Sequence, residues 1–169
     1  MNQHLASIPP EGRHVYVARV YYEDTDAGGI VYHATYLRYA ERGRTEALRA
    51  LGIPHAALLR DFNLMFVVRR LEVDYLRSAG IDDSLAVETE VLEVGGASAT
   101  LRQTVRGADG PCATLKVRLA CVTTGGNTGP RSGTGKPARL PPRWREVMQA
   151  MRDARPAERG TGADCGGAG

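Results

Sequence analysis

The hydrophobic pattern changes its period once along the chain, and this change limits the folds that are open to it. Residues 34–51 place apolar side chains along one side of a 3.6-residue repeat, which predicts one long helix that Gly52 and Pro54 end. After residue 64 the period becomes two, as in half-buried strands. Strands are predicted at residues 13–22, 71–75, 85–91, 97–106 and 113–119.

The predicted order of elements is therefore β, α, β, β, β, β. One helix followed by a run of strands is typical of an α+β fold, in which a mostly antiparallel sheet is covered on one face by the helix. The other face must meet solvent or another subunit. Gly43 within the helix costs about 1 kcal/mol relative to alanine, which predicts either a close neighbour or compensating packing elsewhere.

Length and glycine content predict a single domain with tails. The 169 residues suffice for one hydrophobic core, and half of the 20 glycines fall in residues 125–135 and 160–169. Proline and apolar residues at helical spacing before the second of these stretches predict a terminal helix. The expected division is an N-terminal tail 1–12, a main domain 13–124, a flexible Gly-rich linker 125–140, a C-terminal helix 141–154 and a disordered tail 155–169.

Charge, hydropathy and cysteine content exclude several classes of protein. The 22 basic and 19 acidic residues are spread along the chain, which argues against nucleic acid as a partner. No apolar run approaches the roughly 18–20 residues of a membrane span, so we expect a cytoplasmic protein. Cys112 and Cys121 lie in one predicted strand and point to opposite faces, while Cys165 lies in the tail, which predicts free thiols.

Common catalytic motifs are missing from the sequence. The segment GPRSGTGK at residues 129–136 has five residues between its outer glycines where a phosphate-binding loop has four, and Pro137 prevents a helix from following. The G-x-S-x-G, C-x-x-C and H-E-x-x-H patterns do not occur. A serine-triad hydrolase and a common type of zinc site are therefore not expected.

The loop EDTDAGGIVYHATY, residues 23–36, joins the first strand to the long helix. Gly28 and Gly29 allow a sharp turn, and the helix start presents unpaired N–H groups with a partial positive charge. No Ser, Asp or Asn stands directly before Ala34 to cap them. Free donors at this position could bind an anion or a developing oxyanion.

The acidic residues of this loop are open to three interpretations. Asp24 and Asp26 would share one face of an extended segment, and with His33 they could form a metal site, although no third and fourth ligands are evident. A second interpretation is a solvated acidic turn with a capping histidine. The third is a catalytic loop.

A resemblance favours the third interpretation. The run VYYEDTDAGGIVYHATYLRYAERGRTEALR is similar to the signature of the 4-hydroxybenzoyl-CoA thioesterase family, most closely its branch associated with the Tol-Pal envelope system. The similarity continues through VVRRLEVDYLRSAGIDDSLAVETEV to about residue 124. It implies a hotdog fold, a long central helix wrapped by an antiparallel five-stranded sheet, in a homodimer or homotetramer. The implied activity is hydrolysis of an acyl-CoA thioester without any cofactor or metal, since coenzyme A is part of the substrate.

The resemblance also implies roles for residues of the loop. Asp26 would be the nucleophile or the general base for water, and the backbone N–H at His33, where the helix begins, would polarise the thioester carbonyl. Asp24 is expected to be structural. Substrate-binding residues are expected at Gly28, Gly29, Val31 and Tyr32.

Glu41, on the helix, is a possible further catalytic carboxylate. Glu41 with Arg44 and Arg42 with Glu46 are, however, equally plain surface ion pairs. Gly43 stands where the family usually has alanine, which could loosen this helix. The arginines available to meet the phosphates of coenzyme A are Arg69, Arg70, Arg77, Arg102 and Arg118.

The chemistry of thioester hydrolysis is compatible with a site that has few catalytic groups. A coenzyme A thiol resembles cysteine, with a pKa of about 8.5, so it leaves as a thiolate without strong acid assistance. One carboxylate and one oxyanion site then suffice. Two alternatives remain: a hotdog hydratase or dehydratase, and a non-catalytic module that binds acyl-CoA or an acyl carrier protein.

Overall fold

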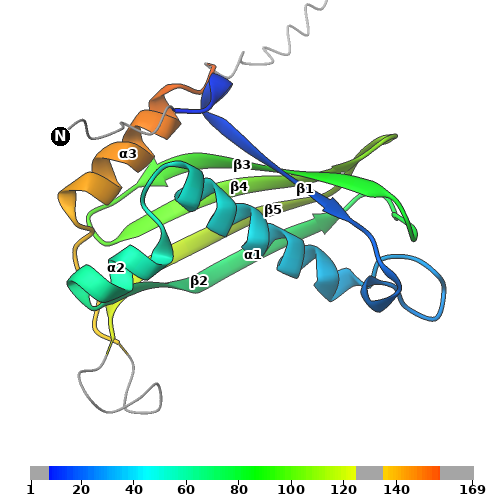
Figure 1. Cartoon of the computed structure of the whole chain (residues 1–169), viewed down its shortest axis with the longest axis horizontal. Coiled ribbons are helices and arrows are strands. Elements are labelled where there is room, and N and C mark those ends of the chain that lie inside the picture. Colours follow the sequence, from blue (N-terminus) through cyan, green and yellow to red (C-terminus); the bar gives the residue numbers. More distant parts are fainter. Residues whose placement is uncertain (1–7, 125–134, 157–169) are drawn as a thin grey trace, which may run out of the picture.

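The computed structural model describes residues 8–124 and 135–156, and in them five antiparallel strands form one sheet in the order β1-β3-β4-β5-β2. The long helix α1 crosses one face of this sheet, and α2 and α3 lie at one of its ends (Figure 1). This confirms the predicted α+β arrangement. The strands are β1 (Arg13–Arg19), β2 (Leu64–Tyr75), β3 (Ser84–Val94), β4 (Ser98–Gly107) and β5 (Gly110–Thr123). The helices are α1 (His33–Ala50), α2 (His55–Phe62) and α3 (Pro142–Asp153), with single turns η1 (Pro10–Gly12) and η2 (Tyr22–Asp24).

Helix α1 packs unusually close to β3. A Cβ atom built on Gly43 would lie 2.6 Å from Val87 Cγ1 and 3.4 Å from Thr89 Oγ1. Real Cβ atoms do not approach a carbon so closely, so only glycine allows this contact. Of the two explanations that the sequence left open for Gly43, the structure thus shows the close neighbour. The glycine seats the helix and does not loosen it.

A buried polar network joins α1 to the sheet beside this contact. The Gln103 side-chain amide, which is fully buried, donates hydrogen bonds to the Ala40 carbonyl (2.8 Å) and to Thr89 Oγ1 (2.9 Å). Its carbonyl oxygen accepts a hydrogen bond from Arg44 Nη1 at 3.1 Å. The Arg44 guanidinium also pairs with Glu41. Because every member of the network has a partner, the polar groups fix the position of the helix on the sheet.

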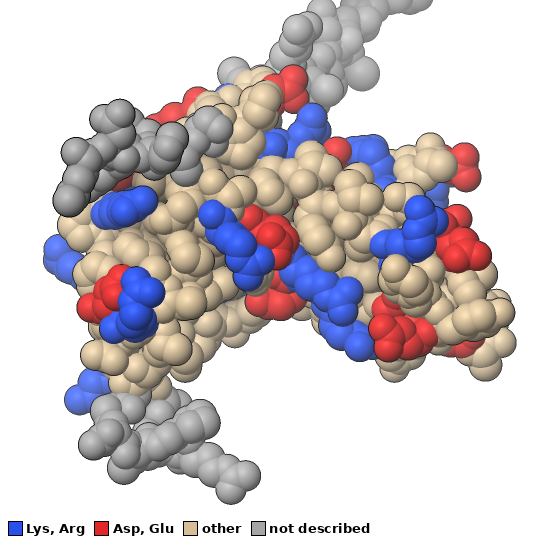
Figure 2. Space-filling model, in the orientation of Figure 1, with Lys and Arg blue, Asp and Glu red and all other residues tan. Residues whose placement is uncertain are grey.

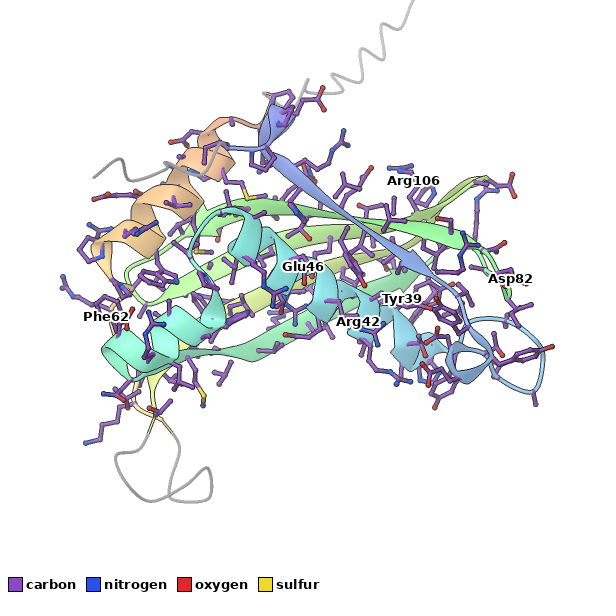
Figure 3. All side chains as sticks on the ribbon, in the orientation of Figure 1. Tyr39, Arg42, Glu46, Phe62, Asp82 and Arg106 are labelled. Carbon is purple, nitrogen blue, oxygen red and sulfur yellow. The ribbon has the colours of Figure 1, made fainter. Side chains whose placement is uncertain are left out.

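The ion pairs of α1 differ in part from those expected. Glu41 and Arg44 do pair, but Arg44 is only 7% exposed, so this is not a plain surface pair. Burial lowers the pKa of Arg44, although a guanidinium remains charged. Arg42 and Glu46 both project from α1 (Figure 3), yet Glu46 pairs with Arg49.

Two segments before and after α1 depart from the predicted elements. The first strand ends at Arg19 and not at residue 22, because the chain then folds into the turn η2. Residues 55–62 form α2, which the sequence pattern did not predict. This short helix starts after Pro54 and buries Leu58 against the core, and Asn63 ends it in a left-handed conformation.

Strand β2 lies at an edge of the sheet and is more exposed than its alternating pattern predicts. One side of β2 pairs with β5 from Leu64 to Tyr75, with a register shift next to Arg69. Its apolar residues Val68, Leu71 and Tyr75 are 49%, 37% and 49% exposed. In the single chain, nothing therefore covers the apolar side chains of this strand, which the sequence pattern predicted to be half-buried. The unpaired backbone groups along its free edge can form hydrogen bonds with another strand.

The C-terminal helix forms as predicted and closes one end of the core. Trp144, Met148 and Met151 of α3 are buried, and the ring of Trp144 packs against Phe62 of α2 at a centroid distance of 5.4 Å. The last part of the expected linker, residues 135–140, bonds to β5, and Leu140 is buried. Residues 1–7, 125–134 and 157–169, with Cys165, lie outside the described residues.

The face of the sheet opposite α1 carries charged side chains. Glu88 pairs with Arg13 and Arg106, and Glu90 pairs with Arg102 and Arg155. Figure 2 shows the other side of the molecule, on which α1 lies, and there acidic and basic side chains are interspersed without a continuous basic stripe. Cys112 and Cys121 are free and buried. Within residues 8–124 and 135–156, no helix is long and apolar enough to cross a membrane.

Gly43→Ala tests the seating of α1. Alanine in a helix normally stabilises by about 1 kcal/mol relative to glycine. Here the new methyl group would collide with Val87 in the core, so we expect a net loss of roughly 1–3 kcal/mol in the free energy of unfolding. The measurement is urea denaturation. Gly96→Ala is the control, because nothing lies within 4 Å of a Cβ there. A Gly43→Ala protein as stable as the wild type would contradict the close approach.

Candidate functional site

A tight turn orients the Asp26 carboxylate. The Gly28 N–H donates to Asp26 Oδ1 at 2.8 Å, and the Gly29 N–H donates to the Asp26 carbonyl at 3.0 Å. Gly29 has a φ of 75°, which glycine adopts without strain. The Asp26 side chain is exposed, and Oδ2 receives no hydrogen bond from the described residues. One carboxylate oxygen is thus held and the other is available.

Asp24 anchors this turn to the rest of the fold. It is 5% exposed, and its Oδ2 accepts a hydrogen bond from the Tyr21 N–H at 2.9 Å. Its carbonyl accepts one from the Tyr32 N–H, also at 2.9 Å. The structural role expected for Asp24 is confirmed. The expectation that Asp24 and Asp26 share a face is wrong, because η2 buries the first carboxylate and leaves the second exposed.

The start of α1 has no side-chain cap, as the sequence predicts. Tyr32 is the N-terminal flanking residue and makes no capping hydrogen bond, and the Thr35 N–H donates to the Tyr32 carbonyl at 2.8 Å. Among the described residues, nothing accepts a hydrogen bond from the N–H of His33 or Ala34. Two donors with the partial positive charge of the helix end are therefore free to bind an anion.

Tyr75, at the end of the edge strand β2, braces the helix start. Its hydroxyl donates a hydrogen bond to the His33 carbonyl at 3.0 Å. Its ring meets the rings of His33 and Tyr36 edge-on, with centroids 6.3 and 5.8 Å apart. The sequence analysis missed this residue, because Tyr75 lies 42 positions from His33 and only the tertiary fold joins them.

A hollow of about 380 Å³ lies between the turn, the helix start and the end of β2. It brings together four of the predicted site residues: Asp26, Val31, Tyr32 and His33. Gly28 and Gly29 shape the turn but do not line the hollow. The remaining lining residues are Ile30, Tyr36, Tyr75, Leu76, Arg77 and Ser78.

The charges around this hollow are few. Asp26 and Arg77 are the lining residues with full charges, and Arg77 is the member of the expected arginine set that lies here. Burial raises the pKa of Tyr36 to about 12, with the neighbouring Cys112 adding to the rise, so the phenol is neutral at ordinary pH. Burial and the nearby Asp24 also raise the pKa of Tyr39, which lies further along α1 (Figure 3).

Glu41 is not part of this hollow. It lies eight residues beyond His33, which is about 12 Å along the helix axis. It lines a separate cavity beneath α1, together with Arg44 and His55. In the described part of the chain, no group of three or more His, Cys, Asp and Glu side chains is placed to hold a metal ion. Among the described residues that line the hollow, Asp26 is therefore the one carboxylate.

Comparison with known proteins agrees with this architecture. The sequence pattern of the thioesterase superfamily matches residues 28–114. The acyl-CoA thioesterase YbgC of Haemophilus influenzae is 50% identical to the chain over 107 residues, 63% of this chain and 79% of that protein. The acyl-CoA thioester hydrolase YbgC of Escherichia coli is 42% identical over 105 residues, 62% of this chain and 78% of that protein.

A solved structure extends the comparison to three dimensions. The crystal structure of a probable thioesterase from Bartonella henselae has a TM-score of 0.69 and 37% sequence identity. It covers 76% of this chain, and the match spans 99% of that chain. With its long helix against a five-stranded antiparallel sheet, the chain belongs to the thioesterase superfamily and has its hotdog fold.

Proposed function

We propose that the protein is an acyl-CoA thioesterase, which uses water to cleave an acyl-CoA into a free acid and coenzyme A. One observation carries this proposal: a single hollow holds an exposed carboxylate, Asp26, beside two free N–H donors at the start of α1. A carboxylate and an oxyanion site suffice for thioester hydrolysis. The names of the similar H. influenzae and E. coli proteins support the same activity.

The helix start would hold the thioester carbonyl. Its oxygen accepts hydrogen bonds from the His33 and Ala34 N–H groups, which stabilise the negative charge as the carbonyl carbon becomes tetrahedral. Donors of this kind contribute about 3–4 kcal/mol to transition-state stabilisation. Tyr75 keeps the first turn of the helix in place by its bond to the His33 carbonyl. The imidazole of His33 lines the hollow, where it could orient water or the thioester.

Asp26 would activate the attack through its free oxygen, Oδ2. As a general base it takes a proton from water while the water oxygen bonds to the carbonyl carbon; the C–S bond then breaks and the thiolate leaves. As a nucleophile it bonds to that carbon itself and expels the thiolate, and water then hydrolyses the resulting anhydride. Both routes balance without a cofactor or a metal, because the coenzyme A thiolate is a good leaving group.

Asp26→Asn tests this assignment. An amide is neither a base nor a nucleophile, so kcat/KM for thiol release from acyl-CoA should fall by about 100-fold or more, while the fold is retained. Glu23→Gln is the matched control, since it removes an exposed carboxylate three positions away. Equal rates for Asp26→Asn and the wild type would refute the role of Asp26. A loss in Glu41→Gln alone would assign the role to Glu41, and no thiol release by the wild type would favour a binding module.

Tyr75→Phe tests the brace at the helix start. The hydroxyl hydrogen bond contributes about 0.5–1.5 kcal/mol, so kcat should fall roughly threefold to tenfold, with little change in KM. Tyr22→Phe is the control, because Tyr22 is 83% exposed and its side chain makes no hydrogen bond with the described residues. A kcat in Tyr75→Phe equal to that of the control would show that the bond does not support catalysis.

The uncovered edge of β2 supports a homodimer in which two β2 strands pair. Val68, Leu71 and Tyr75 are exposed along this edge, and pairing would cover them and join two sheets into one. The homotetramer, an acyl carrier protein as partner, the cytoplasmic location and the link to the Tol-Pal system stay predictions. An acyl carrier protein would present the same pantetheine thioester to the site as acyl-CoA does.

Leu71→Lys tests this interface. A charge in the middle of the paired edge would be buried without a partner, so light scattering should give a mass near the 18.2 kDa of one chain. Val15→Lys is the control, since Val15 is an exposed apolar residue on β1, at the opposite edge of the sheet. If Val15→Lys dissociates the dimer and Leu71→Lys does not, the interface lies at the β1 edge of the sheet, and the proposed pairing of β2 strands is wrong.

A further inference from the structure

A second hollow, also of about 380 Å³, lies at the end of the sheet against the turn between β4 and β5. Its lining is rich in polar groups, with the charged side chains of Arg77, Asp83 and Asp109 and the hydroxyls of Ser78 and Ser84. Arg77 and Ser78 also line the hollow at the helix start. The two hollows therefore meet at these two residues.

Residues 76–83 join β2 to β3 and form a ridge between the two hollows. Because β5 and β4 lie between β2 and β3 in the sheet, the ridge crosses the end of the sheet. The Val31 N–H, just before α1, donates to the Ala79 carbonyl at 2.8 Å. The Arg77 N–H donates to the Cys112 carbonyl of β5 at 3.1 Å. The ridge is thus held to the segment before α1 on one side and to the sheet on the other.

The head of the Arg77 side chain lies on the side of the second hollow. A Cβ atom built on Gly110, in the turn between β4 and β5, would lie 3.9 Å from Arg77 Nε. Arg77 is exposed, and its side chain makes no hydrogen bond or ion pair with the described residues. A guanidinium presents a planar fork of donors that matches phosphate oxygens. This unpaired guanidinium is therefore available to bind an anionic group of a ligand.

The carboxylates of the second hollow restrict which anion it can hold. Asp83 Oδ2 accepts a hydrogen bond from the Gly80 N–H at 2.8 Å, whereas no described residue donates to the Asp109 side chain. Their two negative charges outnumber the positive charge of Arg77, so they oppose a bare phosphate or carboxylate ion. A ligand that fits must also carry N–H or O–H donors for the carboxylates. An adenine nucleotide has both kinds of group: phosphates, and an exocyclic amine with a ribose hydroxyl.

The position of the second hollow suits the part of an acyl-CoA that the first hollow leaves out. A thioester carbonyl at the start of α1 occupies the first hollow, and the pantetheine arm must leave it. Two adjoining hollows of about 380 Å³ each fall within the roughly 300–1,000 Å³ that small-molecule sites occupy. Ser78 stands where they meet, so its hydroxyl is placed to bond to an amide of the arm.

We propose that the second hollow binds the adenosine diphosphate part of coenzyme A. Arg77 binds the diphosphate, Asp83 and Asp109 accept hydrogen bonds from the adenine amine and the ribose hydroxyl, and the pantetheine arm crosses the ridge at Ser78. This inference rests on the proposed thioesterase function. It makes coenzyme A esters the preferred substrates over thioesters of an acyl carrier protein, which have the pantetheine arm but no adenosine.

The first experiment compares an acyl-CoA with the pantetheine thioester of the same acyl group, which lacks the nucleotide. The acyl group is the one that the wild type hydrolyses fastest in a panel from acetyl- to benzoyl-CoA. In Arg77→Gln, the ratio of kcat/KM for acyl-CoA to kcat/KM for acylpantetheine should fall about tenfold, mainly through KM for acyl-CoA. Arg118→Gln is the matched control, since Arg118 is exposed and lines neither hollow.

The second experiment fills the hollow and probes it with a free nucleotide. Ala108 is exposed in the turn between β4 and β5 and lines the second hollow but not the first. Ala108→Trp should lower the same ratio about tenfold, and it decides the question should Arg77→Gln fail to fold. Adenosine 3′,5′-bisphosphate should compete with acyl-CoA in the wild type, with an inhibition constant that rises about tenfold in Ala108→Trp.

The outcomes separate this inference from the function on which it rests. A ratio unchanged in both variants, in an enzyme that releases thiol, overturns the inference alone, as does a fall in Arg118→Gln but not in Arg77→Gln. A bisphosphate that changes kcat for acylpantetheine without competing with acyl-CoA would make the hollow a regulatory nucleotide site and overturn its assignment to the substrate. A wild type that releases thiol from no acyl-CoA overturns the proposed function, and this inference with it.

Discussion

The fold depends on how α1 is seated on the sheet. The Gln103 amide reaches the Ala40 carbonyl from within the core, and Gly43 lets the helix backbone approach Val87. An apolar contact alone fixes the position of a helix weakly, whereas a buried hydrogen bond has a narrow range of allowed geometry. Because this seat lies midway along α1, it determines where the helix start meets β2 and how much space remains beneath the other half of the helix.

The helix start combines rigid anchors with unused polar groups. Buried Asp24 fixes the approach of the chain, and Tyr75 fixes the first turn from the side of β2. Between these anchors, Asp26 Oδ2 and the first N–H groups of α1 have no partners among the described residues. Unpaired polar groups in a well-held frame need little rearrangement when a substrate binds, and this preorganisation is the main source of electrostatic catalysis.

The sequence predicted those features that local spacing determines. The change of hydrophobic period predicted the long helix and the strands. Gly28 and Gly29 predicted the turn, and the absence of a capping residue before Ala34 predicted the free N–H groups at the helix start. Tyr75, the burial of Arg44 and the helix α2 escaped prediction for different reasons. Tyr75 and Arg44 acquire their partners from elements distant in sequence, Tyr75 from His33 at the start of α1 and Arg44 from Gln103 on β4. Helix α2 has eight residues, too few to show a clear repeat, and tertiary packing of Leu58 stabilises it.

The free edge of β2 also affects the chain before it assembles. Along this strand, the apolar residues Val68, Leu71 and Val73 are interrupted by four charged ones, namely Arg69, Arg70, Glu72 and Asp74. Charged side chains on an exposed edge oppose indiscriminate strand addition, since most foreign strands cannot neutralise them. These charges thus protect newly made chains from indiscriminate aggregation at this edge.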